Sequence, residues 1–139
     1  MKIPVALFAA ALLSACQTPH QFATPDKSWR THIGQLKYSD AKRTLIGDVV
    51  VQQRGAQEFQ LEFQKAGGIP LLTLREDAAI ARAEGLFARG SWQGAPASAP
   101  THLRTWVALR EAFQKPAPGA QQSMDFPADG QQFVFQFNR

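Results

Sequence analysis

Apolar and polar residues alternate, with a period of two residues, along two segments of the chain. Residues 58–65 place Phe59, Leu61 and Phe63 on one side and glutamate or glutamine on the other. Residues 133–138 repeat the pattern with three phenylalanines on one side. This period is typical of a β-strand with one buried face. Three further runs, apolar or rich in β-branched residues, predict additional strands at residues 29–38, 44–53 and 71–75.

Short turn sequences separate these runs at a spacing of about ten residues, as in an antiparallel meander. The turns fall at residues 39–40, 54–57, 66–70 and 76–77. The same spacing predicts two more strands at residues 78–84 and 86–92. The alternative for residues 77–89 is a helix, because Ala, Arg and Glu favour helices locally.

One amphipathic helix is predicted at residues 101–114. Ser98 can cap this helix, and Pro100 falls in its first turn, where a missing N–H group costs nothing. Residues 115–129 are rich in Pro, Gly, Gln and Ala and predict a loop. The apolar face of the helix would carry Leu103, Trp106, Val107 and Phe113.

The pattern as a whole predicts a mainly β (α+β) fold. We expect an antiparallel meander or half-open barrel of about six or seven strands, with the helix packed on its concave face. If one helix does not fill that face, large apolar side chains would line a site for lipid or acyl chains. The alternative is a fully packed core with no ligand. The expected lining residues are Phe59, Leu61, Phe63, Leu72, Leu74, Trp106, Phe133, Phe135 and Phe137.

The first residues predict an exported protein with a lipid anchor. Lys2 precedes an apolar run at residues 3–13, which is shorter than the ~20 residues of a membrane-spanning helix. The sequence Leu-Ser-Ala-Cys that ends at Cys16 resembles the lipobox of bacterial lipoproteins. This resemblance implies cleavage before Cys16 and its acylation, which anchors the chain in a membrane. Gln17, rather than Asp, follows the cysteine, and this favours the outer membrane, where we expect the anchor to face the periplasm.

These boundaries predict three segments in the chain. Residues 1–15 are expected to be a signal peptide, residues 16–28 a lipidated cysteine with a flexible polar tether, and residues 29–139 one β-rich domain. Cleavage leaves 124 residues, and loss of Lys2 reduces the formal net charge from +4 to +3. No Lys/Arg run occurs, so we expect no nucleic-acid partner, and we expect a monomer.

Recognisable catalytic and cofactor motifs are missing from the sequence. It contains no GxSxG, GxGxxG, GxxxxGK[ST] or HExxH, and His20, His32 and His102 are widely separated. The single cysteine falls at the predicted lipidation site, so no other thiol is present. The acidic residues, Glu76 among them, fall mostly at turn or solvent-facing positions. We therefore expect no catalytic residues, no metal and no cofactor, and we expect a protein that is not an enzyme.

Two segments resemble the LolB family of outer-membrane lipoprotein receptors, which is related to LolA. Residues 47–74 have that family's order of strands and turns, and the predicted helix contains an L-R-x-W-V sequence at residues 103–107. The resemblance implies a half-open barrel whose concave face holds acyl chains, and a role in lipoprotein localisation. It also implies that Ile69, or next Leu71, inserts into the membrane. The alternative for Ile69 is a structural position under the sheet edge.

Overall fold

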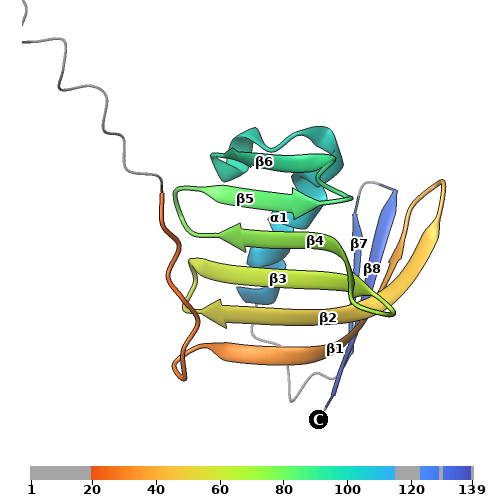
Figure 1. The fold of residues 1–139 in the computed structure, drawn as a ribbon, viewed down its shortest axis with the longest axis horizontal. Helices are drawn as coiled ribbons and strands as arrows, with labels where there is room; N and C mark the ends of the chain where they lie inside the picture. The colour runs from red at the N-terminus through yellow and green to blue at the C-terminus, as the bar shows by residue number, and fades with distance from the viewer. Residues whose placement is uncertain (1–19, 115–122, 129, 139) are drawn as a thin grey trace, which may run out of the picture.

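The computed structural model describes residues 20–114, 123–128 and 130–138. These residues form one open, eight-stranded antiparallel sheet in the order β6-β5-β4-β3-β2-β1-β8-β7, with one α-helix on one face (Figure 1). The fold class predicted from the sequence is confirmed, with eight strands where six or seven were expected. The elements are β1 (Arg30–Ser39), β2 (Thr44–Arg54), β3 (Glu58–Lys65), β4 (Ile69–Glu76), β5 (Ala81–Gly85), β6 (Gly90–Gly94), η2 (Pro96–Ser98), α1 (Thr101–Gln114), β7 (Ser123–Ala128) and β8 (Gln131–Phe137).

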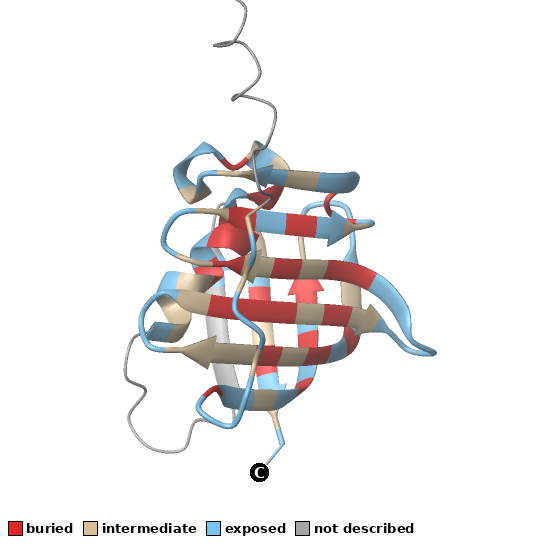
Figure 2. Ribbon diagram, turned by 60° about the vertical axis from the view of Figure 1, so that its left-hand side comes forward, coloured by how far each residue is buried: buried red, intermediate tan, exposed pale blue. Residues whose placement is uncertain are grey.

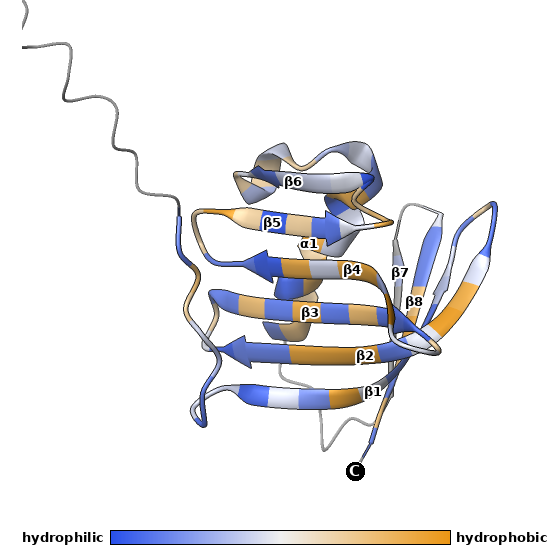
Figure 3. Ribbon diagram, viewed as in Figure 1, coloured by the Kyte–Doolittle hydropathy of each residue, from blue (hydrophilic) through white to orange (hydrophobic). Residues whose placement is uncertain are grey.

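The alternating segments form the strands that they predict. In β3 the residues Phe59, Leu61 and Phe63 are buried, while Glu62 and Gln64 are partly exposed on the other face. The alternation of apolar and polar residues is visible along β3 and β4 in Figure 3. Burial of one face fixes the register of each strand, because a slip of one residue would expose the whole apolar set.

Of residues 77–89, for which strands and a helix were alternatives, residues 81–85 form β5 and residues 86–89 form the turn into β6, so the second predicted strand begins later than expected. β5 and β6 pair with each other between Ala81 and Gly94, so the helix considered for residues 77–89 is wrong. The chain reverses between them at three residues with positive φ, Gly85 (116°), Arg89 (54°) and Gly90 (110°). This turn permits pairing that local helix propensity would oppose, and tertiary context routinely overrides propensity.

The predicted loop at residues 115–129 is wrong at residues 123–128. These residues form β7, which pairs with β8 along its length, from Ser123 opposite Gln136 to Ala128 opposite Gln131. β7 is the last strand of the sheet, and an edge strand can accommodate a proline such as Pro127. The pairing partner, rather than a local alternating pattern, makes this segment a strand.

A glycine allows the C-terminal strands to join the sheet beside β1. Gly34 of β1 is paired with Phe137 of β8. A Cβ atom at Gly34 would lie 2.0 Å from the carbonyl oxygen of Gln136, so any side chain there would push β8 away. The close approach places β8 beside β1, with Phe133 and Phe135 in the core.

The core lies between α1 and the face of the sheet that carries the phenylalanines (Figure 2). α1 contributes the buried residues Leu103, Trp106, Val107 and Leu109. Trp106 is fully buried, and its ring lies 4.7 Å from that of Phe133 between centroids. No helix within the described residues is long and apolar enough to span a membrane.

The only tyrosine of the chain, Tyr38, lies in this core, and its ionisation measures how far the core is shielded from solvent. Tyr38 is 2% exposed, and its hydroxyl donates a hydrogen bond to Asp40 over 3.0 Å. Burial, together with the hydrogen bond to the Asp40 carboxylate, raises the pKa of Tyr38 to about 12.

We therefore expect at most about one tenth of the full phenolate absorbance in the folded protein at pH 10 to 11, measured by ultraviolet titration while circular dichroism stays native. The same chain in denaturant should titrate near the ordinary tyrosine pKa of about 10. A phenolate transition near pH 10 in the folded chain would show that Tyr38 is open to solvent.

Candidate functional site

The nine predicted lining residues meet where α1 packs on the sheet, with Trp106 contributed by the helix and the other eight by the strands. Eight of them are buried, with Phe59 the most exposed at 2%, and Phe137 is half-buried at the margin. The rings of Tyr38, Phe87 and Phe133 lie within 5.5 Å of the ring of Trp106, centroid to centroid. Phe113 of α1 closes the other end of the core against Phe135 at 5.2 Å. These side chains therefore contact one another and the helix.

Two surface pockets of the described residues lie outside this core. One, of about 370 Å³, lies where residues 21–23 cross the ends of β2, β3 and β4, and Phe59 is the one predicted lining residue that borders it. The other, of about 310 Å³, lies beside Phe113 and is bordered by Arg30 and Arg54. None of the buried residues of α1 borders either pocket.

The predicted insertion turn is exposed, but only at one of its two residues. Ile69 is 58% exposed, which excludes the position under the sheet edge. Leu71 is 3% exposed, so the expectation that it inserts into a membrane is wrong in this conformation. The pairing of β3 with β4 shifts register between Phe63 and Gln64, so Leu71 has no partner residue on β3. Its side chain packs in the core. The carbonyl of Leu71 accepts a hydrogen bond from the N–H of Phe87.

Three hairpin turns meet at the same end of the sheet, at the right of Figure 1. They join β1 to β2, β3 to β4 and β5 to β6. Their exposed side chains combine aliphatic and basic character. We call this surface the turn face, and it consists of Lys42, Arg43, Lys65, Ile69, Leu86 and Arg89.

One basic residue of the turn face, Arg43, lies over an aromatic ring next in sequence to the exposed Leu86. The guanidinium of Arg43 lies 4.6 Å from the ring centroid of Phe87, the residue after Leu86. Leu86 itself is 62% exposed, more than any other large apolar residue in the described part of the chain. An exposed aliphatic residue with cations around it suits a surface that is both negatively charged and apolar below, such as an anionic bilayer.

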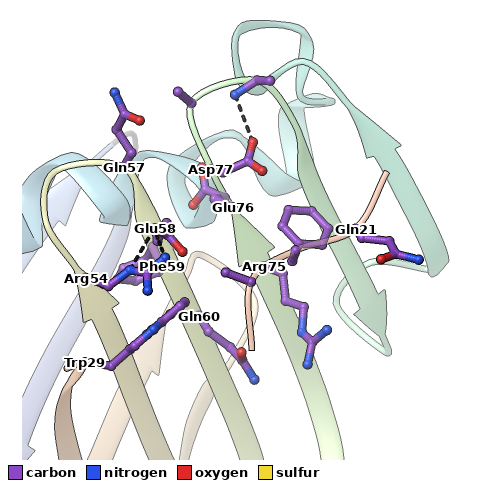
Figure 4. A pocket seen from close by; sticks show the side chains of 14 residues that line it. Gln21, Trp29, Arg54, Gln57, Glu58, Phe59, Gln60, Arg75, Glu76 and Asp77 are labelled. Carbon is purple, nitrogen blue, oxygen red and sulfur yellow. Dashed lines mark hydrogen bonds and ion pairs between the residues drawn. The ribbon is translucent and has the colours of Figure 1, made fainter. Parts of the chain in front are cut away.

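A second cluster lies at the opposite end of the strands, where the tether meets the sheet (Figure 4). His20 and Asp77 form a hydrogen bond of 2.5 Å between Nε2 and Oδ2. The sequence predicts a flexible coil for the tether and does not indicate this contact. The two residues are separated by 57 positions in the sequence, so no local sequence pattern predicts that they pair.

Glu76 is a buried carboxyl at this end of the core. It is 2% exposed rather than at a solvent-facing turn, because it is the last residue of β4 and lies on the same face as Leu74. Burial raises the pKa of Glu76 to about 8, and Arg110 opposes this rise only in part, with its Nε 3.8 Å from Oε1. Within the described residues neither carboxyl oxygen has a hydrogen-bond partner. Glu76 is therefore protonated at neutral pH.

The predicted lipidation site, Cys16, and the signal peptide lie outside the described residues. Among the residues that are described, no group of three or more His, Cys, Asp or Glu side chains is arranged to hold a metal ion. Comparison of the chain with models of known protein families and with curated proteins finds no match.

Proposed function

We propose that this chain is a lipoprotein of the bacterial outer membrane that acts without catalysis, through the surface of a domain with a packed core. The observation that carries the proposal is the occupied concave face. Trp106 of α1 and the phenylalanines around it were expected to line a ligand site, but they contact one another instead. The lipobox sequence at Cys16 supports the membrane anchor.

The turn face is the part of the domain best suited to contact a membrane surface. Ile69 and Leu86 are each more than half exposed, and four basic residues accompany them. Burying an exposed aliphatic side chain in the interfacial region is favourable by about 25 cal/mol for each Å². Each basic residue near an anionic surface adds on the order of 1 kcal/mol. Together these contributions favour peripheral docking beside the lipid anchor.

Replacing Ile69 with aspartate tests this docking. We expect the mature chain with Cys16→Ser to float with anionic vesicles, and Ile69→Asp to weaken this binding by about tenfold or more, since it removes apolar area and adds a repelled charge. Using the unlipidated chain isolates the contribution of the turn face.

Ile33→Asp is the matched control, because Ile33 is 53% exposed but lies within β1, away from the three turns. Equal binding of the wild type and Ile69→Asp would contradict docking through the turn face. Equal loss in both variants would show an effect of net charge alone.

A second candidate function is the binding of an acyl chain beneath α1, as the LolB resemblance implies. One observation favours it: α1 is the one α-helix within the described residues, and it alone covers the concave face of the open sheet. An acyl chain could enter only if α1 moved away from the sheet. This candidate therefore requires an opening that uncovers Trp106 and Phe133.

A further inference from the structure

The first described residues lie against the folded domain and do not extend away from it. Residues 20–28 run along the strand ends opposite the turn face (Figure 1). Residues 21–23 form one wall of the 370 Å³ pocket, and the ends of β2, β3 and β4 form the other (Figure 4). Phe22 is half-buried there, and its ring meets the imidazole of His20 edge-on, with the centroids 4.8 Å apart.

The acceptor for His20 is held in place by its own turn. Oδ1 of Asp77 accepts hydrogen bonds of 2.9 Å from the N–H groups of Ala79 and Ile80, which leaves Oδ2 free for His20. Partial burial acts to raise the pKa of Asp77, but these two donors and His20 together hold it below the usual range. A fixed, ionised carboxylate is a strong acceptor for an imidazole N–H.

The sheet beneath this segment is shielded from solvent. Gln60 lies on the outer face of β3 and is nevertheless 7% exposed, whereas Glu62, two residues further along the same face, is only half-buried. Trp29, which follows the tether, is 8% exposed, and the guanidinium of Arg54 lies 5.5 Å from its ring. Both Gln60 and Trp29 border the pocket that residues 21–23 close.

We propose that residues 20–23 form an intramolecular strap that docks the tether on these strand ends and so holds the domain close to the membrane. The proposal rests on the proposed lipidation of Cys16. With the strap docked, only residues 17–19 separate Cys16 from the domain. With the strap released, residues 17–28 separate Cys16 from Trp29. The maximum reach rises from roughly 14 Å to roughly 45 Å.

The two states differ in what the turn face can reach. The turn face lies at the far ends of the strands, and an eight-residue strand such as β3 spans roughly 26 Å. When the strap is docked, the strand ends opposite the turn face are the ends that the anchor holds at the bilayer. Release gives the domain enough chain to turn over and bring Ile69 to the same bilayer. The strap therefore controls whether the turn face can contact the membrane that holds the anchor.

Cleavage by chymotrypsin after Phe22 tests the strap itself, with the full chain in detergent micelles. We expect His20→Ala to speed this cleavage by about tenfold, because it removes the contact with Asp77 and exposes the strap. Thr24→Ala is the matched control, since Thr24 is exposed and lies outside residues 20–23. Equal cleavage rates in the wild type and His20→Ala would overturn the proposal, whether or not Cys16 is lipidated.

A spin label at Gln57→Cys tests the consequence for the membrane. Gln57 is exposed near the strap, and lipidation leaves the introduced cysteine as the one free thiol. In vesicles with nickel chelated at the headgroups, we expect strong relaxation of the label, reduced at least about twofold by combined His20→Ala and Phe22→Ala as the reach lengthens. Unchanged relaxation overturns the strap. Two labels on each chain would instead show that Cys16 is free, and the lipoprotein proposal would fail.

Discussion

Replacing Trp106 with alanine should lower the free energy of unfolding by about 4 kcal/mol. Trp106 is fully buried, and its ring lies within 6 Å of four other rings, those of Tyr38, Phe63, Phe87 and Phe133. Alanine would leave a cavity among these rings and remove their contacts with the helix. Equilibrium unfolding in urea, followed by circular dichroism, measures the change.

The size of this loss distinguishes the two views of the concave face. A residue that lines a ligand cavity has fewer contacts to lose, so its truncation would cost far less stability. Phe137→Ala is a useful comparison, because Phe137 is half-buried at the margin of the core. We expect it to cost less than Trp106→Ala. A loss below about 1 kcal/mol for Trp106→Ala would contradict the packed core.

Replacing Glu76 with glutamine should stabilise the protein above pH 8. The folded-state pKa of about 8 lies above the ordinary value of 4.5, so the folded chain binds this proton more tightly than the unfolded chain. Stability from this group is complete below pH 4.5 and is lost as the pH rises to 8. The total change is on the order of 5 kcal/mol, at about 1.4 kcal/mol for each pH unit. Glutamine removes the ionisation and hence this slope.

Urea unfolding at several pH values between 4 and 9 measures this effect. Glu84→Gln is the control, because the Glu84 side chain is 48% exposed and paired with Arg82 on the surface. We expect the wild type and Glu84→Gln to lose stability in parallel across this range, while Glu76→Gln stays level by comparison. Parallel curves for all three proteins would show that Glu76 ionises normally in the fold.

The sequence predicted the fold where local pattern and burial agree. Residues 58–65 and 133–138 alternate cleanly, and each corresponds to a strand of the sheet, β3 and β8. β7 was missed because its pairing with β8, not its own composition, makes it a strand. The predicted number of strands was therefore one too few, because β7 depends most on its partner strand.

The candidate site was less predictable, because its key contacts join distant residues. Alternation identified which phenylalanines share a face, but not whether one helix fills it. The choice between core and cavity depends on how the rings of Tyr38 and Phe87 fit around Trp106. The contact between His20 and Asp77 likewise joins residues 57 positions apart in the sequence.

The central claim, a packed core that carries no ligand, is tested most directly by native mass spectrometry of the mature chain with Cys16→Ser. We expect the mass of the polypeptide alone, and no uptake of a fluorescent fatty acid by the same sample. A lipid bound in a one-to-one ratio, displaced by added fatty acid, would contradict the claim. That result would favour an acyl-chain carrier in which α1 opens.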